Sequence, residues 1–424
     1  MKYKKTVLKN GLRIITVLMK DNPTATVLVL VGAGSKYEDK KVNGISHFME
    51  HLFFKGTKNR PTSLDITKEF DGLGAQSNAF TGHEMTGYWA KSQAKNSSKL
   101  LDIISDLYTN PLFPEKEIEK EKGVIIDEMN MYEDMPMIRV EELFMEVLYG
   151  DQPVGKKLIG EKENIYRMTS KDFIQYRDQH YVAESTVVMV AGGGFDEKKI
   201  IQEIEKKFEQ ISLAKKGKKK KVIEKQTKPN ILIKTKDTDQ THLFLGVRTF
   251  GLQSKYKAAL SVLAGILGQG MSSRLFQKIR DEMGVGYYVR AATDFFTDHG
   301  FLTVKTGVDN KRVLEVIKAI LIELNKTTKD LVDEKELKKV KDYLTGNFML
   351  GLESSDAIAG YYGEQEILKK EITEPATLIK EIQAVTANEV RAIARKIFKN
   401  DRLNLALIGP FKDKKPFEKI LKFK

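Results

Sequence analysis

The sequence repeats part of itself at a distance of about half its length. Residues 169–192 align without a gap on residues 386–409, a displacement of 217 positions (386 minus 169). A second match joins Glu115-Lys-Glu-Ile to Glu334-Lys-Glu-Leu, at a displacement of 219 (334 minus 115). Two matches in one order at nearly one displacement predict two similarly folded halves rather than two unrelated domains.

The length and the local patterns set the expected fold class. A chain of 424 residues with 41% hydrophobic content is long enough for two domains with their own cores. The patterns indicate a hairpin over 6–19 that turns at Asn10-Gly11, a buried strand over 26–31, and strands over 76–80 and 85–91, with helices between and after them. We therefore expect an α+β protein of two homologous domains, each a mostly antiparallel sheet covered by helices.

One segment without apolar periodicity separates the two halves. Residues 214–229 are rich in lysine, poor in apolar residues and contain Pro229 near their end. This composition is typical of a linker. We expect domains over 1–213 and 230–424, with the linker over 214–229.

The first half contains a helix pattern with an unusual polar face. From Gly44 to Gly56, apolar residues recur at helical spacing, and His47 and His51 lie four positions apart on one face. Glu50 leans over the same face. The pattern H-x-x-E-H is the inverted form of a zinc-peptidase helix, in which two imidazoles bind one ion. The alternative is an ordinary polar helix face.

A third metal ligand is expected on the long helix that follows Pro114. A catalytic zinc needs three protein ligands, and a chain without cysteine must supply them from His, Asp or Glu. Glu121 and Glu128 lie seven positions apart, two turns along one helix face, with Val124 and Ile125 between them. Glu128 is the candidate ligand, and Glu121 could orient a ligand histidine. The alternative is a solvated helix in a charge-rich chain.

The second half lacks this polar face. At a displacement of about 214, His47, Glu50 and His51 fall opposite three residues that do not bind zinc: Ser261, Ala264 and Gly265. We therefore expect the chemistry in the first half, with the second half supplying a wall, a lid or substrate contacts.

Together these residues carry a family resemblance over nearly the whole chain. His47-Phe-Met-Glu50-His51, followed by Glu128, resembles the pitrilysin or insulinase family of zinc metallopeptidases, above all its half-size branch similar to mitochondrial processing peptidase. The stretch 77–81 resembles the family's substrate-binding edge strand, and 274–287 resembles its second-half motif.

The resemblance implies a role for each of these residues. It implies Zn²⁺ held by His47, His51 and Glu128, with Glu50 as general base and Glu121 in support of a ligand. It implies that Arg280 and Tyr287 reach the substrate backbone and the developing oxyanion. The residues implied to bind the peptide as an added strand are Ser77, Asn78, Ala79 and Phe80.

The resemblance also implies an activity and an assembly. It implies a zinc metalloendopeptidase that cuts short or unfolded peptides, in which one chain forms half of a clamshell around a chamber. A second unit must then come from a partner, and we expect a homodimer, with a non-identical partner subunit as the alternative.

Two other kinds of function are alternatives to the peptidase. A chain of this family type could be a catalytically silent scaffold or substrate-binding subunit, although the complete set of site residues argues against that. A net charge of +13 invites a nucleic-acid partner, but much of the excess lies in the lysine run over 215–221, and no nucleic-acid-binding motif accompanies it. The sequence has no apolar run long enough for a membrane span, and its basic start is not followed by an apolar segment, so we expect a cytoplasmic protein without a membrane partner.

Overall fold

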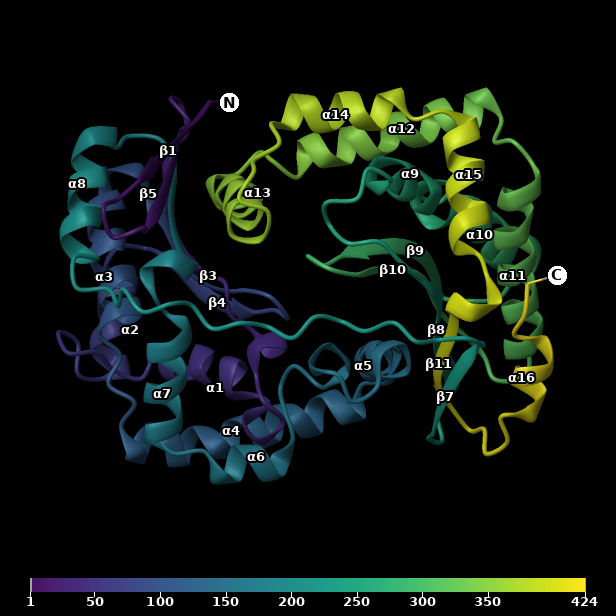
Figure 1. Cartoon of the computed structure of the whole chain (residues 1–424), viewed down its shortest axis with the longest axis horizontal. Helices are drawn as coiled ribbons and strands as arrows, with labels where there is room; N and C mark the ends of the chain where they lie inside the picture. Colours follow the sequence, from purple (N-terminus) through teal and green to yellow (C-terminus); the bar gives the residue numbers. More distant parts are fainter. Residues whose placement is uncertain (1, 424) are drawn as a thin grey trace. The chain divides into compact units, whose positions relative to one another are not determined.

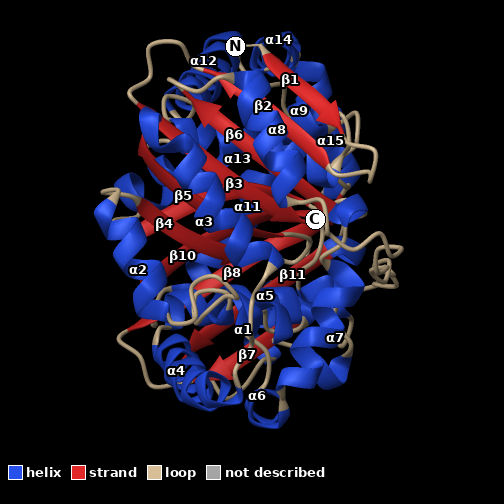
Figure 2. Ribbon diagram, turned by 90° about the vertical axis from the view of Figure 1, so that its left-hand side faces the viewer, coloured by secondary structure: helices blue, strands red, loops and turns tan. Residues whose placement is uncertain are grey.

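The computed structural model describes residues 2–423, which form two compact units (Figure 1). Within the described residues, unit 1 comprises 2–130, 156–220 and 350–372, and unit 2 comprises 131–155, 221–349 and 373–423. Each unit has one sheet, covered by helices (Figure 2).

The sheet of unit 1 has six strands in the order β1-β2-β6-β3-β5-β4. Only β2 and β6 run parallel, and every other neighbouring pair is antiparallel. β1 and β2 form the expected hairpin around Gly11, whose φ of 88° suits a tight turn. The strands are β1 (Tyr3–Val7), β2 (Arg13–Leu18), β3 (Thr24–Val31), β4 (Gln76–Thr81), β5 (Thr86–Gln93) and β6 (Thr186–Gly192).

The sheet of unit 2 repeats this topology without the first strand. Its order is β7-β11-β8-β10-β9, with one parallel pair, β7 and β11, at the matching place. The strands are β7 (Asn230–Thr235), β8 (Gln240–Thr249), β9 (Tyr288–Phe295), β10 (Gly300–Asp309) and β11 (Leu403–Gly409). The expected pair of similarly folded, mostly antiparallel halves is confirmed.

The helices that carry the sequence repeat begin in the same way in both units. Thr169 caps α7 (Ser170–His180) in a capping box with Asp172, and Thr386 caps α15 (Ala387–Ile397) in a capping box with Glu389. The other helices from the first half of the chain that lie in unit 1 are α1 (Ile45–Leu52), α2 (Ser63–Gly72), α3 (Ser97–Thr109), α4 (Glu115–Asp134, which ends in unit 2), α6 (Lys162–Arg167) and α8 (Glu197–Lys207).

Two apolar layers of unit 2 pack on opposite faces of its sheet. Alternate residues of β8 and β11 belong to different clusters, as a strand's period of two requires. Leu243 and Leu245 pack with α9 (Lys257–Gly268), α11 (Val313–Lys329) and α15, whereas Phe244 packs with α5 (Pro136–Tyr149). The remaining helices are α10 (Arg274–Phe276), α12 (Glu334–Leu350), α14 (Pro375–Ala384) and α16 (Lys415–Ile420).

Each unit takes one helix from the other half of the chain. α5 packs on β7, β8 and β11 of unit 2, and α13 (Ser355–Leu368) packs on β2, β3 and β6 of unit 1. Figure 1 shows α3 and α8 on one side of the first sheet and α13 on the other. Buried Glu366 fixes α13 there, because its carboxylate pairs with Lys5 at 2.8 Å and Arg13 at 3.2 Å. The compact units therefore differ from the contiguous ranges 1–213 and 230–424.

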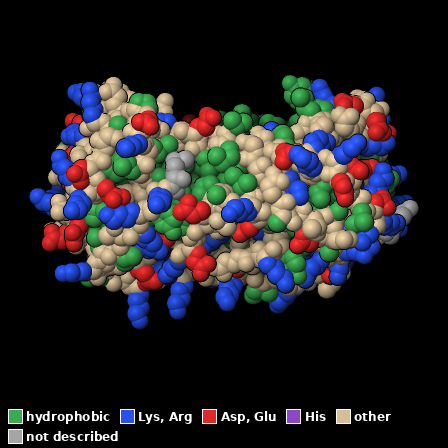
Figure 3. Space-filling view, turned by 90° about the horizontal axis from the view of Figure 1, so that it is seen from above, with side chains coloured by type: hydrophobic (Ala, Val, Ile, Leu, Met, Phe, Trp, Pro, Cys, Tyr) green, Lys and Arg blue, Asp and Glu red, His purple; other side chains and the backbone are tan. Residues whose placement is uncertain are grey.

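The expected linker contains no helix or strand over 214–229. On the face of the molecule drawn in Figure 3, Lys and Arg side chains are interspersed with Asp and Glu. Within residues 2–423, no helix has both the length and the apolar character needed to cross a membrane.

Candidate metal centre

The helix that carries H-x-x-E-H is held firmly at its start. Gly44 precedes α1 with a φ of 100°, and a Cβ there would lie 2.7 Å from the carbonyl oxygen of Ile159. The buried carboxylate of Glu38 accepts hydrogen bonds from the backbone N–H of Gly44 at 2.8 Å and of Ser46 at 2.9 Å. An acid at a helix N-terminus satisfies free donors and complements the helix dipole. Glu38 therefore fixes the direction in which α1 leaves its first turn.

Three of the expected ligand residues converge. His47, His51 and Glu128 offer one ligand atom each, and these atoms all lie within 4.8 Å of one another. The Oε2 atom of Glu128 is 3.7 Å from Nε2 of His47 and 3.6 Å from Nε2 of His51. α1 supplies both histidines and α4 supplies the glutamate.

The spacing and the chemistry of this group fit a zinc ion. Zinc binds histidine nitrogen and carboxylate oxygen at about 2.0–2.2 Å in a tetrahedral arrangement, which separates neighbouring ligand atoms by about 3.3 Å. The observed distances of 3.6 and 3.7 Å are slightly longer, so small side-chain movements would complete the coordination. Two imidazoles and one carboxylate leave a fourth position open, as in catalytic zinc sites.

His47 is poised as a neutral ligand. Burial and, to a smaller extent, the neighbouring His51 lower its pKa to about 4, although Glu128 acts in the opposite direction. A neutral imidazole has a free lone pair, which metal binding requires.

Glu50 lies beside the ligands and is held by a neighbouring strand. Its Oε2 accepts a hydrogen bond of 2.6 Å from the hydroxyl of Thr81, the last residue of β4. Burial raises the pKa of Glu50, although the hydrogen bond from Thr81 acts against this effect. The carboxylate is therefore fixed close to the ligand group, where a general base is needed.

Glu121 contacts His51, one of the candidate ligands. Its Oε1 lies 2.9 Å from Nδ1 of His51, and its Oε2 pairs with Lys55 at 2.6 Å. Burial alone would raise the pKa of Glu121, but these two hydrogen bonds outweigh it and lower the pKa. A carboxylate on the far nitrogen of a histidine fixes the ring orientation and leaves Nε2 free for metal. Between the two α4 acids, Ile125 is buried as expected, whereas Val124 is half exposed.

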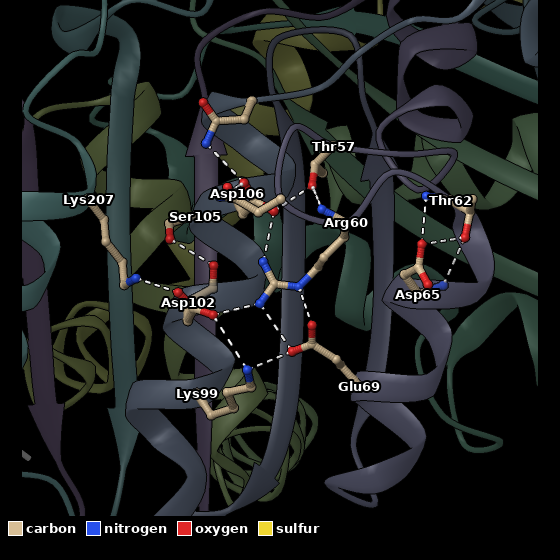
Figure 4. A network of polar contacts seen from close by, with 12 residues as sticks. Thr57, Arg60, Thr62, Asp65, Glu69, Lys99, Asp102, Ser105, Asp106 and Lys207 are labelled. Atoms are coloured by element: carbon tan, nitrogen blue, oxygen red, sulfur yellow. Dashed lines mark hydrogen bonds and ion pairs between the residues drawn. The ribbon is translucent and has the colours of Figure 1, made fainter.

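The segment after α1 is anchored by a buried arginine (Figure 4). The guanidinium of Arg60 donates hydrogen bonds to Glu69 at 2.8 Å, Asp102 at 2.6 Å and Asp106 at 2.8 Å. These partners come from α2 and α3, so Arg60 joins the loop that follows α1 to two helices of unit 1. Thr57 adds a hydrogen bond to Asp106.

The expected substrate strand is β4, which lies at one edge of the sheet and pairs only with β5. Its other edge carries backbone groups that an extended peptide could pair with. β4 also contacts α1, and Thr81 at its end holds Glu50. The residues proposed to contact peptide, Ser77 to Phe80, are thus followed at once by the residue that hydrogen-bonds Glu50, the candidate general base.

Arg280 and Tyr287 lie in unit 2 and contact each other. The guanidinium of Arg280 donates hydrogen bonds to the carbonyl oxygens of Gly286 at 3.0 Å and Tyr287 at 3.1 Å, and lies over the Tyr287 ring at 5.8 Å. The Tyr287 side chain is 78% exposed. Arg280 therefore holds the backbone that presents an accessible phenol.

Sequence reasoning missed four residues that support the site: Glu38, Lys55, Arg60 and Thr81. Two of them had a local signal, since Lys55 follows His51 by four positions and Thr81 ends the expected substrate strand. Glu38 and Arg60 act through contacts that no local pattern predicts.

Two family models match successive parts of the chain. The model described as "Insulinase (Peptidase family M16)" matches residues 13–162, which include the candidate ligands. The model described as "Peptidase M16 inactive domain" matches residues 167–344, which include the region without them.

Similar whole chains are also known. An uncharacterised zinc protease of Bacillus subtilis is 34% identical over 96% of this chain and 98% of its own length. An uncharacterised zinc protease of Mycobacterium leprae is 33% identical over 99% of this chain and 94% of its own. Among solved structures, a protease from Helicobacter pylori has a TM-score of 0.90 at 24% identity, and covers 96% of this chain and 99% of its own. The sequence matches support a peptidase-type function, and the structural match supports the fold.

Proposed function

Since the chain belongs to the insulinase (M16) peptidase family, we propose that it is a zinc-dependent endopeptidase that hydrolyses short or locally unfolded peptides. The observation that carries this proposal is the convergence of His47, His51 and Glu128 beside Glu50, which a scaffold subunit would not need. The division of roles is two histidines and one glutamate for the metal, and one glutamate for proton transfer.

The proposed mechanism assigns the proton to Glu50. A zinc ion held by the three ligands would supply Lewis-acid chemistry, polarising a carbonyl oxygen and lowering the pKa of water to about 7. Glu50 accepts the proton that the attacking water loses and delivers it to the leaving amine, so one carboxylate acts as base and then as acid. The hydroxyl of Thr81 keeps one oxygen of Glu50 occupied and thereby orients the other.

Substrate binding is proposed to use the open edge of β4. A peptide added as a further strand gains main-chain hydrogen bonds, and its side chains point alternately towards and away from the sheet face. This mode requires an extended backbone and little particular sequence. We therefore expect broad cleavage of unstructured peptides and resistance of folded proteins.

We propose a homodimer in which Arg280 and Tyr287 of one subunit contact the substrate at the metal site of the other subunit. The exposed phenol of Tyr287 suits a hydrogen bond to the developing oxyanion, while Arg280 holds its backbone and reaches the peptide main chain. If each site is completed by the partner subunit, a mixture of Glu50→Gln and Tyr287→Phe proteins recovers activity after subunit exchange. A mixture no more active than either variant alone, with exchange shown by a labelled subunit, contradicts the shared site.

The proposed function is tested by cleavage of a mixed pool of unstructured peptides. We expect cleavage that stops on chelation and returns with zinc. A protein that binds zinc tightly and cuts no peptide would favour the scaffold subunit instead.

A further inference from the structure

Unit 2 contains a pocket that has no part in the proposed peptidase chemistry. It has a volume of about 480 Å³ and lies between the linker, Gln152 and Arg248. Three of the lining residues are cations, namely Lys225, Lys228 and Arg248, and none of the described lining residues is acidic. The lining therefore carries a formal charge of +3.

Arg248 is the unusual member of this lining. Arg248 is only 6% exposed. Its Nε and Nη1 atoms are buried, yet they have no hydrogen-bond partner among residues 2–423. A buried donor without a partner costs about 1–3 kcal/mol, and more when it is charged. The guanidinium lies over the Tyr149 ring at 5.3 Å, and that contact occupies its face but leaves its N–H groups free.

Attraction from an acid compensates Arg248 only in part. Burial lowers the pKa of Arg248, and the charge of Glu224 opposes this effect without a hydrogen bond to the guanidinium. The hydroxyl of Tyr149 is also buried without a partner among the described residues. Unsatisfied donors thus gather at one place in the fold.

Hydrogen bonds hold the wall of the pocket in place. The Gln152 amide pairs with the backbone of Ile223 in both directions, at 2.7 Å and 3.1 Å. The Gln226 amide donates to the Leu403 carbonyl oxygen at 2.9 Å and accepts from Asn404 at 3.1 Å. These contacts fix linker residues beside β11, so the two lysines project from a supported segment.

We propose that this pocket binds a small multivalent oxyanion, either a phosphoryl group or a dicarboxylate. Guanidinium groups bind planar carboxylates and phosphates through charge-assisted hydrogen bonds, and the pocket volume falls in the range of small-molecule sites. Three cations without an acid in the lining favour more than one negative charge. Arg248 and the two lysines would supply the positive charge that such a ligand needs.

Calorimetric titration of the zinc-loaded chain tests the proposal, with inorganic phosphate and succinate as separate probes and acetate as the monovalent control. We expect saturable binding of at least one divalent probe with a Kd at or below about 1 mM, and weaker binding of acetate. Whichever probe binds more tightly identifies the ligand as phosphoryl or dicarboxylate. The same affinity in His47→Ala protein separates this site from the metal centre, so the result does not depend on peptidase activity.

Substitutions locate the binding. Arg248→Met should weaken binding by about tenfold or more, whereas Arg391→Met, which removes a cation that bonds only Asn388 on its own helix, should leave it unchanged. Because Arg248→Met could unfold the unit, a Lys225→Met and Lys228→Met double variant provides a second test, with an expected loss of about two- to tenfold. Absence of saturable binding by wild type, or wild-type affinity in the folded double variant, would overturn the proposal.

Discussion

Helices α1 and α9 hold the same place in their units, yet only α1 of the two carries candidate metal ligands. α1 contacts edge strand β4 and helix α7, and α9 contacts edge strand β9 and helix α15. The residues opposite His47, Glu50 and His51 are Ser261, Ala264 and Gly265. Ala264 and Gly265 are buried, so the face that carries the candidate ligands in one unit packs against protein in the other.

The neighbouring helices differ in the same sense. The displacement of 219 that joins α4 to α12 places Val340 opposite Glu121 (340 minus 121). In unit 1, His51 contacts Glu121 at 2.9 Å. In unit 2, the matching pair packs so closely that a Cβ on Gly265 would lie 2.6 Å from Cγ1 of Val340. A histidine–carboxylate pair in one unit thus corresponds to an apolar helix contact in the other.

The fold therefore does not require the polar pair of His51 and Glu121. Unit 2 forms the corresponding sheet, without its first strand, and matching helix contacts, with a glycine and a valine at these positions. Unit 1 keeps two buried or half-buried acids that need Lys55, Thr81 and the histidines as partners. Such a costly arrangement is expected where chemistry, rather than stability, determines the residues.

The largest expected effect comes from removing a ligand in α1. His47→Ala should abolish stoichiometric zinc binding and lower peptide cleavage by about a thousandfold or more, since two ligands hold zinc poorly. Zinc content after dialysis and cleavage rate measure this. The matched variant Ser261→Ala in α9 should change neither quantity, and an equal loss in both variants would remove the distinction between the helices.

The turn before β5, which contains Glu84, offers a test of pH dependence. Burial alone would raise the pKa of Glu84, but Lys36 and Lys219 hold it at about 2. A lowered pKa stabilises the fold above the unfolded value of 4.5, and this contribution is lost as pH falls towards 2. Wild type should exceed Glu84→Gln in unfolding free energy by up to about 3 kcal/mol at pH 7.

Urea unfolding in EDTA at several pH values between 7 and 2 measures this difference, because titration of the metal-binding residues is then common to both proteins. The two unfolding free energies should converge as pH approaches 2. A difference that stays constant with pH would show that Glu84 does not titrate in this way.

Glu121 is expected to tune the metal site without being a ligand. Glu121→Gln should weaken zinc binding or lower activity by about 10- to 100-fold, because His51 loses its charged partner. Glu119→Gln on the same helix, where the acid pairs with Lys122 at the surface, serves as the control and should have little effect. Zinc affinity by chelator competition, combined with cleavage rates, measures both variants; equal behaviour would deny Glu121 an orienting role.

The smallest expected effect concerns the apolar counterpart in unit 2. Gly265→Ala should destabilise the protein by about 1–3 kcal/mol, since the added methyl group meets Val340. Gly346→Ala in α12, where a Cβ has nothing within 4 Å, should instead stabilise by about 0.5–1 kcal/mol. Thermal or urea unfolding measures both. Neutral behaviour of Gly265→Ala would mean that the two helices can move apart and that the close contact is not needed.

Much of the fold and the metal group could be predicted because their signals are local or repeated. Helical spacing placed His47, Glu50 and His51 on one face, and the repeat predicted matching strands that the structure has as β6 and β11. The exchange of α5 and α13 could not be predicted, because an amphipathic pattern tells that a helix is covered but not which sheet covers it. Arg60 and Arg248 were missed for a similar reason: their partners, or lack of partners, depend on contacts distant in sequence.

We propose that α1 and α4 divide metal binding and proton transfer among His47, His51, Glu128 and Glu50. Zinc content and peptide cleavage, measured side by side for wild type and Glu50→Gln, test it most directly. We expect about one zinc per chain in both proteins, with cleavage in wild type alone. Zinc loss in Glu50→Gln, or cleavage that survives the substitution, would contradict it.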